Sequence, residues 1–377
     1  MIRFLMICVA VLVPAVSASA QSTREDSVLS RRGWFGVALG PHENGVLVTG
    51  LAPGSPAAEA GIRAGDVIRT IDNAAVRKPE DVTATIGRHV GGETAVVAYV
   101  RAGEAREVPV VLRPFPRETL PGATVEYGSV TLSDGSRLRT IVSIPNGGGA
   151  FPAVMLLQGG GCNSVDVPMV ADADRRDPLI MIATRGFVTM RVEKSGLGDS
   201  KGPPCAEIGY LQELEGYRAA LAALKRHPSV KADETYLLGI SLGGVFAPIV
   251  ASESAVHGIA VFAALPWPPS PYPGRSDRFF REIARIDLDK AWSAVSARVL
   301  ILYGELDETM TGIDRTRIAR AVNDRRPGAA TQVEFPGLDH CWTRHESMEQ
   351  SRGRCGQGRN EASLVADTVL RFLQNAR

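Results

Sequence analysis

The sequence lacks an excess of charge of either sign: 42 lysines and arginines oppose 41 aspartates and glutamates, for a formal net charge of +1. This balance excludes nucleic acid or an acidic polymer as a partner, because such partners require a clear basic excess. Beyond its first residues, the sequence also lacks an apolar run long enough to span a membrane. Its length of 377 residues and hydrophobic content of 45% are typical of a globular protein with about two domains.

Residues 1–20 have the pattern of a secretory signal peptide. A positive start and an apolar stretch over residues 4–16 are followed by small residues at 18–20. The alternative is an uncleaved membrane anchor, but the apolar stretch is shorter than the roughly twenty residues that a spanning helix needs. We therefore expect an exported protein, periplasmic or secreted, without a membrane span once the signal peptide is cleaved. The polar residues 21–32 are expected to form a flexible leader.

Cysteine is scarce, with 5 in the chain, one of them inside the signal peptide. The others are Cys162, Cys205, Cys341 and Cys355. An even number of cysteines in an exported chain suggests disulfides, and counting alone leaves three connectivities open. No Cys-x-x-Cys motif or histidine pair accompanies them, so their spacing fits no metal site, and we expect no cofactor.

Across residues 33–114, short apolar runs alternate with turn residues, and helices are predicted at residues 55–60 and 79–89. Ser55 is placed to cap the first helix, with a proline in its opening turn. The block SPAAEAGIRAGDVI, which ends at Ile68, resembles a PDZ domain of the bacterial type that is fused to exported serine proteases. The resemblance covers the whole of residues 33–114 and implies a small α+β domain.

The same resemblance implies a groove that binds peptides. The loop of residues 34–37 would bind the carboxylate at the C-terminus of a peptide through its backbone amides. This loop consists of Trp34, Phe35, Gly36 and Val37. The peptide would add as a strand beside residues 37–39, under the second predicted helix. The alternative is that the domain is only a spacer or a lid within the chain, because a fold does not determine a function.

Prolines in residues 115–122 remove strand donors and stiffen the chain, which predicts a linker. In residues 123–377, apolar strands alternate with helical patterns. The predicted strands at 153–157 and 187–192 are apolar throughout, as expected for a parallel sheet that helices cover on both faces. The predicted fold class is therefore α/β, with a doubly wound and mostly parallel sheet that follows the smaller α+β domain.

Residues 266–296 are predicted to form a small cap over a pocket. The prolines at their start prevent a continuous helix, while residues 277–283 have a helical pattern. Aromatic side chains in such an insertion can wall a binding site, and this one contains Trp267, Tyr272, Phe279, Phe280 and Trp292. The alternative is a plain surface excursion.

The most specific motif is the hexapeptide GISLGG at residues 239–244, with Ser241 at its centre. An apolar strand precedes it and an apolar helical stretch follows it, which is the order that a nucleophile elbow requires. A serine in such a turn has a strained backbone, so that the residues two positions away must lack bulky side chains. Gly239 and Gly243 satisfy this requirement. The alternative is a glycine-rich turn without a catalytic role.

A catalytic serine needs a base and a carboxylate that orients the base. Asp307 is the expected carboxylate, because it follows the predicted strand 299–303 in the phrase GELDETM. Asp289 and Glu308 remain alternatives, and an aspartate in a loop can also be a plain solvated residue.

His340 is the expected base, in the phrase PGLDHCW between the last predicted strand and the last predicted helix. His345 is the alternative, and a lone histidine is often structural. Ser241, Asp307 and His340 follow one another in the order of the α/β-hydrolase superfamily. The resemblance to that superfamily covers residues 123–377 and implies acyl transfer by the serine.

The negative charge that develops on the substrate oxygen needs amide donors. The amide of Leu242, directly after the serine, is the first candidate. The second is expected in the glycine turn after the first buried strand, where Gly160 is the best candidate and Gly161 the next. The superfamily often has His-Gly at this turn, whereas Gln158-Gly159 stands here, which leaves the second donor open between the two glycines and a plain tight turn.

The ends of adjacent strands would bring Cys162, beside this turn, close to Cys205. The pair Cys341–Cys355 would then brace the loop that carries His340. Each bond would stabilise the fold by about 2–4 kcal/mol by restricting the unfolded chain.

These observations predict an exported serine hydrolase that cleaves a carboxylic ester or a related acyl bond through an acyl-enzyme. The superfamily branches with the closest similarity are peptidases and dienelactone hydrolases, so peptides and lactones remain possible substrates. A first alternative is a serine peptidase that uses the PDZ-like groove to bind the C-termini of peptides. A second alternative is a non-catalytic peptide-binding protein.

Overall fold

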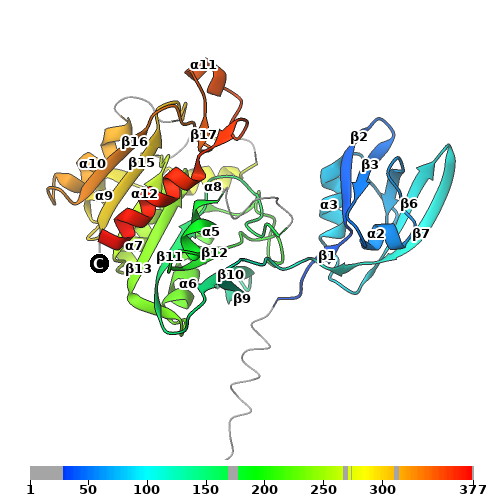
Figure 1. Ribbon diagram of the computed structural model, residues 1–377, viewed down its shortest axis with the longest axis horizontal. Coiled ribbons are helices and arrows are strands. Elements are labelled where there is room, and N and C mark those ends of the chain that lie inside the picture. Colours follow the sequence, from blue (N-terminus) through cyan, green and yellow to red (C-terminus); the bar gives the residue numbers. More distant parts are fainter. Residues whose placement is uncertain (1–28, 169–176, 266–270, 273, 310–313, 376–377) are drawn as a thin grey trace, which may run out of the picture.

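The computed structural model describes residues 29–168, 177–265, 271–272, 274–309 and 314–375. They form two domains, a smaller N-terminal one and a larger C-terminal one (Figure 1). The predicted signal peptide, the first part of the predicted leader, and residues 266–270 and 273 of the predicted cap lie outside the described residues.

The N-terminal domain is an antiparallel sheet with two short helices. Its elements are β1 (Gly33–Trp34), β2 (Val37–His42), β3 (Gly45–Leu51), α2 (Pro56–Glu59), β4 (Val67–Ile71), β5 (Ala74–Ala75), α3 (Pro79–Ile86), β6 (Thr94–Arg101), β7 (Glu104–Val111) and β8 (Arg113–Pro114). The strand order is β2-β3-β4-β6-β7. Ser55 accepts a hydrogen bond from the amide of Ala58 and so caps α2, as its sequence predicts.

The chain enters and leaves this domain through two strands that lie side by side, because β1 pairs with β8. Just before β1, residues 29–32 pack on the C-terminal domain. Arg31 is buried and forms ion pairs with Asp166 at 2.7 Å and Asp199 at 2.5 Å. Arg139 donates a hydrogen bond to the carbonyl of Leu29 at 2.6 Å. The last residues of the predicted leader are thus tied to the C-terminal domain through the buried charge of Arg31 and the carbonyl of Leu29.

The C-terminal domain contains an eight-stranded mixed sheet. Its elements are β9 (Ala123–Thr131), β10 (Arg137–Pro145), β11 (Phe151–Leu157), α5 (Pro178–Ala183), β12 (Val188–Val192), α6 (Tyr210–Lys225), β13 (Val230–Ile240), α7 (Gly243–Glu253), β14 (Gly258–Phe262), α8 (Asp277–Ile283), α9 (Leu288–Ser293), β15 (Arg298–Gly304), α10 (Asp314–Asn323), β16 (Ala330–Phe335), β17 (Thr343–Arg344), α11 (Met348–Ser351), β18 (Arg359–Asn360) and α12 (Ala362–Asn375). The strand order is β16-β15-β14-β13-β11-β12-β10-β9. The strands from β11 to β16 run parallel, and β9 and β10 are antiparallel, which confirms the predicted α/β fold class.

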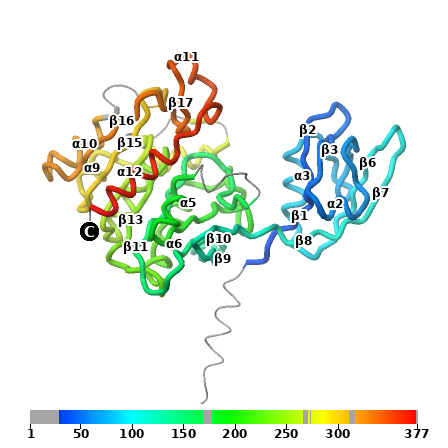
Figure 2. The backbone as a smooth tube through the Cα atoms, viewed as in Figure 1, coloured from blue at the N-terminus to red at the C-terminus, as the bar shows by residue number. Residues whose placement is uncertain are grey.

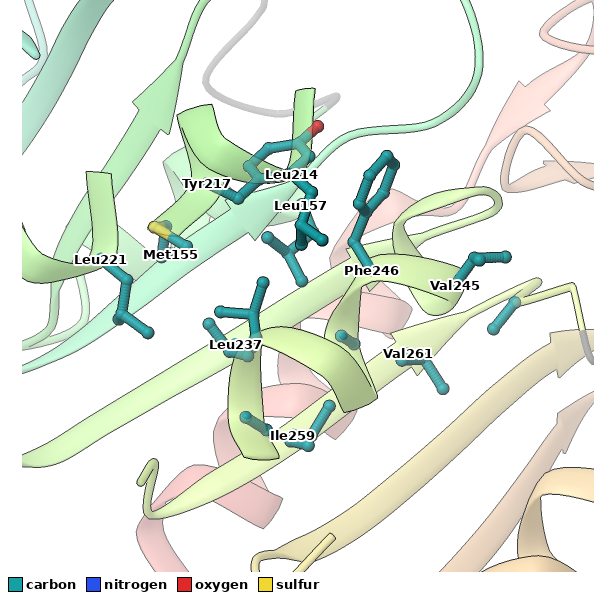
Figure 3. Close-up of a cluster of buried hydrophobic side chains, with 14 of the residues drawn as sticks. Met155, Leu157, Leu214, Tyr217, Leu221, Leu237, Val245, Phe246, Ile259 and Val261 are labelled. Carbon is teal, nitrogen blue, oxygen red and sulfur yellow. The ribbon is translucent and has the colours of Figure 1, made fainter. Parts of the chain in front are cut away.

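Successive side chains of the parallel strands alternate between two apolar cores, as the two-residue period of a strand requires. On one face, Met155 and Leu157 of β11 and Leu237 of β13 pack against α6 and α7 (Figure 3). On the other face, their neighbours in the strands pack against α5 and α12, which lie next to each other (Figure 2). With both faces covered, β13 is fixed in the middle of the sheet, and its carboxyl end is a rigid platform for the residue that follows.

Candidate active site

Ser241 lies in the turn between β13 and α7, at the carboxyl edge of the parallel strands. Its φ of 53° is in the left-handed region, which residues with a side chain rarely adopt. Two backbone hydrogen bonds hold this conformation. The amide of Ser241 donates to the carbonyl of Phe262 at 2.9 Å, and the amide of Gly244 donates to the carbonyl of Ser241 at 3.0 Å. The segment GISLGG therefore forms a strand, a sharp turn and the start of a helix.

The glycines of this turn leave no room for a side chain. A Cβ built on Gly239 would lie 2.9 Å from the carbonyl oxygen of Gly243, and one built on Gly243 would lie 2.1 Å from that of Leu157. A Cβ built on Gly244 would lie 2.3 Å from the Cβ of Ala264. The backbones of β13, α7 and the end of β11 thus approach one another more closely than any other residue would allow.

Asp307 and His340 follow β15 and β16, so they come from the same edge of the sheet as the serine. Nδ1 of His340 lies 2.9 Å from Oδ2 of Asp307. The other carboxylate oxygen of Asp307 accepts hydrogen bonds from the amide and the hydroxyl of Thr309, at 2.9 and 2.6 Å. Burial raises the pKa of Asp307, but the hydrogen bond and charge of His340 and the bonds from Thr309 outweigh it, so this pKa lies below its ordinary value. An ionised Asp307 can orient His340 and stabilise its protonated form.

The hydroxyl of Ser241 forms no hydrogen bond with His340 in the part of the chain that the structure describes. Such bonds are often long before substrate binds. Thr309 was not identified from the sequence, although its hydroxyl lies 2.9 Å from Nδ1 of His340. Its position two residues after the carboxylate is the only signal in the sequence that points to it.

The alternative candidates for the acid and the base do not contact Asp307 or His340 in any hydrogen bond or ion pair between described residues. Asp289 forms an exposed ion pair with Arg317 at 2.6 Å, and Glu308 is exposed. His345 lies 3.0 Å from Asp339, and both side chains are buried.

The glycine turn after β11 packs against the serine, since a Cβ built on Gly159 would lie 3.6 Å from the Cβ of Ser241. Leu242, whose amide is the other expected donor, is the N-cap of α7. Two buried cations, Lys194 and Arg275, contact the carbonyl groups of the turn. The sequence did not identify them, because the residues that they contact are distant along the chain.

Gly160 and Gly161, the expected donors of this turn, have no acceptor for their amides among the described residues. A Cβ built on Gly160 would lie 2.1 Å from the hydroxyl oxygen of Tyr272, so a side chain at this position would displace the tyrosine. Tyr272 packs edge-on against Phe280 of α8, with ring centroids 5.1 Å apart. An aromatic residue of the predicted cap thus reaches the glycine turn.

Two disulfides flank the site. Cys162, directly after the glycine turn, is bonded to Cys205, with a Cα–Cα distance of 5.8 Å. Cys341, directly after His340, is bonded to Cys355, with a Cα–Cα distance of 5.2 Å. These are the two pairs expected from the sequence, and each closes a loop beside a candidate catalytic element.

The N-terminal domain has a groove of about 530 Å³ between β2 and α3. The loop of residues 34–37 lines it, together with apolar side chains of both elements such as Leu39, Val82 and Ile86. Arg32, directly before β1, and Phe115, directly after β8, also line it. The guanidinium of Arg32 lies 3.8 Å from the ring centroid of Phe115, so a cation–π contact joins these two lining residues.

No helix among the described residues is long and apolar enough to cross a membrane. Within the same residues, no group of three or more histidine, cysteine, aspartate or glutamate side chains is arranged to hold a metal ion.

Comparison with known proteins identifies both domains. The family model for the PDZ domain matches residues 33–112. Esterase EstD of Thermotoga maritima is 28% identical over 122 residues, which are 32% of this chain and 29% of that protein. Magnetosome formation protease MamE of Magnetospirillum gryphiswaldense is 38% identical over 74 residues, which are 20% of this chain and 10% of that protein. The chain therefore spans less than a third of the length of these relatives.

Solved structures similar to the C-terminal domain have the α/β-hydrolase fold. The α/β hydrolase GrgF from a Penicillium species has a TM-score of 0.51 at 16% identity, and the match covers 67% of this chain and 99% of that one. Dipeptidyl peptidase 4 of Porphyromonas gingivalis has a TM-score of 0.53 at 15% identity, over 74% of this chain and 46% of that one. This chain thus joins a PDZ domain to a domain with the α/β-hydrolase fold.

Proposed function

We propose that this chain, a PDZ domain followed by an α/β-hydrolase fold, is a serine hydrolase that cleaves a carboxylic ester or a related acyl bond. The observation that carries the proposal is the strained backbone of Ser241 at the carboxyl end of β13. The hydrogen-bonded pair of Asp307 and His340 follows two neighbouring strands that end at the same edge. In open α/β sheets, ligands bind at this edge.

The reaction begins when the Ser241 hydroxyl attacks the acyl carbonyl while His340 accepts the hydroxyl proton through Nε2. The bond to the leaving alcohol then breaks, and the protonated His340 gives that proton to the alcohol oxygen. Water attacks the acyl-enzyme in the same way, which releases the acid and restores the serine. Asp307 keeps the Nδ1 proton of His340 in place throughout, and the amides of Leu242 and the glycine turn stabilise the oxyanion.

Esters are the preferred substrate class because a relative that matches 122 residues of this chain is named an esterase. A peptidase that holds the C-termini of its substrates in the PDZ groove is the second candidate, supported by the open groove of about 530 Å³. A non-catalytic peptide-binding protein is the third. We also propose that the protein is exported, which the signal-peptide pattern and the two disulfides support.

The proposal is tested by labelling the purified mature protein with a fluorescent fluorophosphonate, which reacts with activated serines. We expect labelling of the native protein and none of Ser241→Ala or His340→Ala. His345→Ala is the matched control and should still be labelled, because His345 contacts Asp339 rather than Asp307. Turnover of p-nitrophenyl esters without cleavage of peptides would support an esterase, and the reverse would support a peptidase. A folded native protein that is not labelled would contradict catalysis altogether.

A further inference from the structure

A buried lysine lies behind the glycine turn of the candidate active site. Lys194 follows β12 by two residues, and its side chain is 1% exposed. Its ammonium group donates hydrogen bonds to the carbonyl oxygens of Gly159 at 2.6 Å and Gly161 at 2.9 Å. It also lies 3.2 Å from a carboxylate oxygen of Glu213 on α6. One cation thus contacts two carbonyl groups of a single turn.

A second buried cation binds the carbonyl of Gly160, which lies between the two carbonyls that Lys194 contacts. Arg275, whose side chain is also 1% exposed, donates to the carbonyl oxygen of Gly160 at 3.4 Å and forms an ion pair with Glu213. The carbonyl oxygens of three successive glycines are therefore all bound by Lys194 or Arg275. Glu213 is the common counterion of the two cations.

The orientation of these carbonyls fixes the orientation of the amides. A trans peptide is planar, and its N–H points opposite to its C=O. The described residues contain no cis peptide bond. The amide of Gly160 therefore points away from Lys194, and the amide of Gly161 points away from Arg275. Both amides lack an acceptor among the described residues.

The turn would not keep this orientation on its own. Glycine adopts many backbone conformations, so the peptide planes of a run of glycines can rotate at little energetic cost. Rotation here would remove hydrogen bonds from buried cations, which costs about 1–3 kcal/mol for each group left without a partner. The cations therefore select one of the conformations open to the turn.

We propose that Lys194, assisted by Arg275, is a positioning residue that aims the amides of the glycine turn at the oxyanion of the acyl intermediate. This inference rests on the proposed serine-hydrolase function. Lys194 acts through the backbone and does not touch the substrate. It supplies the rigidity that the amide donors need, because oxyanion stabilisation depends on donors that are already oriented before the reaction.

The variant Lys194→Met removes the charge and the donor but keeps an unbranched side chain of similar length. It leaves Glu213 paired with Arg275, so no buried carboxylate loses its only counterion. Lys194→Gln keeps N–H donors without the charge. The matched control is Lys225→Met, because Lys225 also donates to a backbone carbonyl, that of Ala255, but at the far end of α6.

The experiment measures kcat and KM for p-nitrophenyl acetate, the inhibition constant of benzeneboronic acid, and the thermal unfolding midpoint of each protein. Benzeneboronic acid forms a tetrahedral serine adduct whose oxygen occupies the oxyanion position. For Lys194→Met, we expect kcat to fall by about 10–100-fold with little change in KM, because misoriented donors weaken only the transition state. The affinity for the boronic acid should fall by a similar factor. The kcat of Lys194→Gln and its affinity for benzeneboronic acid should lie between those of Lys194→Met and the native protein. Lys225→Met should have the native values of both.

A folded Lys194→Met protein with native kcat and native affinity for benzeneboronic acid would overturn the inference, even if its unfolding midpoint falls. Should this variant not fold, Lys194→Gln decides by the same two readouts: native values overturn the inference, and a joint loss of kcat and affinity supports it. Failure of the proposed function is distinguishable, because then the native protein itself would show no turnover that depends on Ser241.

Discussion

Nδ1 of His340 lies 2.9 Å from Oδ2 of Asp307, although 33 positions separate the two residues in the chain. Each follows its own strand, and β15 and β16 are neighbours that run parallel. The carboxyl ends of the two strands therefore lie side by side. A residue a few positions after β15 can thus contact a residue a few positions after β16. The fold explains why a carboxylate and an imidazole from separate loops form one pair.

Asp307→Asn should lower kcat by about 10³–10⁴-fold with little change in KM, because an amide favours the wrong tautomer of the histidine. The measurement is steady-state hydrolysis of p-nitrophenyl acetate. Asp289→Asn is the control and should have native kinetics, since Asp289 only pairs with Arg317 on the surface. Equal losses in both variants would show that Asp307 has no special role.

Gly243→Ala should destabilise the protein by about 2–3 kcal/mol, as expected for overpacking. Its new Cβ would lie 2.1 Å from the carbonyl oxygen of Leu157, and neither backbone can move without disturbing the sheet. Urea unfolding measures the change. Gly50→Ala is the control, because its Cβ would lie at an ordinary distance of 3.7 Å from that of Ala38. A Gly243→Ala protein with native stability and activity would contradict the close packing of the elbow.

Replacing both Cys341 and Cys355 by serine should lower the free energy of unfolding by about 3 kcal/mol, the chain-entropy value for a loop of this length. The variant should keep most of its kcat at low temperature. Asp339 still holds the loop of His340, because its carboxylate accepts hydrogen bonds from the amides of residues 341 and 343. Chemical denaturation and kinetics at 10 and 37 °C test both statements. Loss of kcat in the folded variant at 10 °C would mean that the disulfide, and not Asp339, positions the histidine.

The free energy of unfolding should decrease as the pH rises from 5 to 8, because of Glu193. Burial raises the pKa of Glu193 to about 7 from an ordinary value of 4.5, although a hydrogen bond from Ser164 opposes this. Between pH 4.5 and about pH 7, Glu193 keeps its proton in the folded state but has lost it in the unfolded state. Rising pH therefore lowers the free energy of unfolding by up to about 3 kcal/mol. Urea unfolding at several pH values should show a flatter dependence for Glu193→Gln. Parallel curves for the two proteins would contradict the assignment to Glu193.

Local patterns in the sequence predicted much of this molecule. The glycine spacing around Ser241 predicted the elbow, because its steric requirement concerns residues that are adjacent in sequence. The block from Ser55 to Ile68 likewise predicted the PDZ domain. Continuous apolar runs predicted the buried parallel strands. In contrast, no helix was predicted at Asp314–Asn323, although its buried residues Ile318, Ala319 and Val322 have helical spacing.

Buried charges were the main features that the sequence did not predict. Arg31 was assigned to a flexible leader because its neighbours are polar, yet it is buried between Asp166 and Asp199. Lys194 received no role for the same reason, since a lysine in a glycine-rich loop is normally solvated. Burial of a charged residue depends on its partners. Those of Arg31 lie more than a hundred positions away in the chain, so no local pattern reveals them.

The pairing of β1 with β8 has a mechanical consequence. A domain joined to its neighbour by a single linker rotates freely about it, whereas this PDZ domain is joined by two segments of chain that pair as β1 and β8. Such a double attachment permits bending but resists twisting. A single protease cut within residues 115–122 would leave the PDZ domain joined to its neighbour through Arg31 and its two aspartates. The PDZ domain is therefore joined to its neighbour at two places rather than at one.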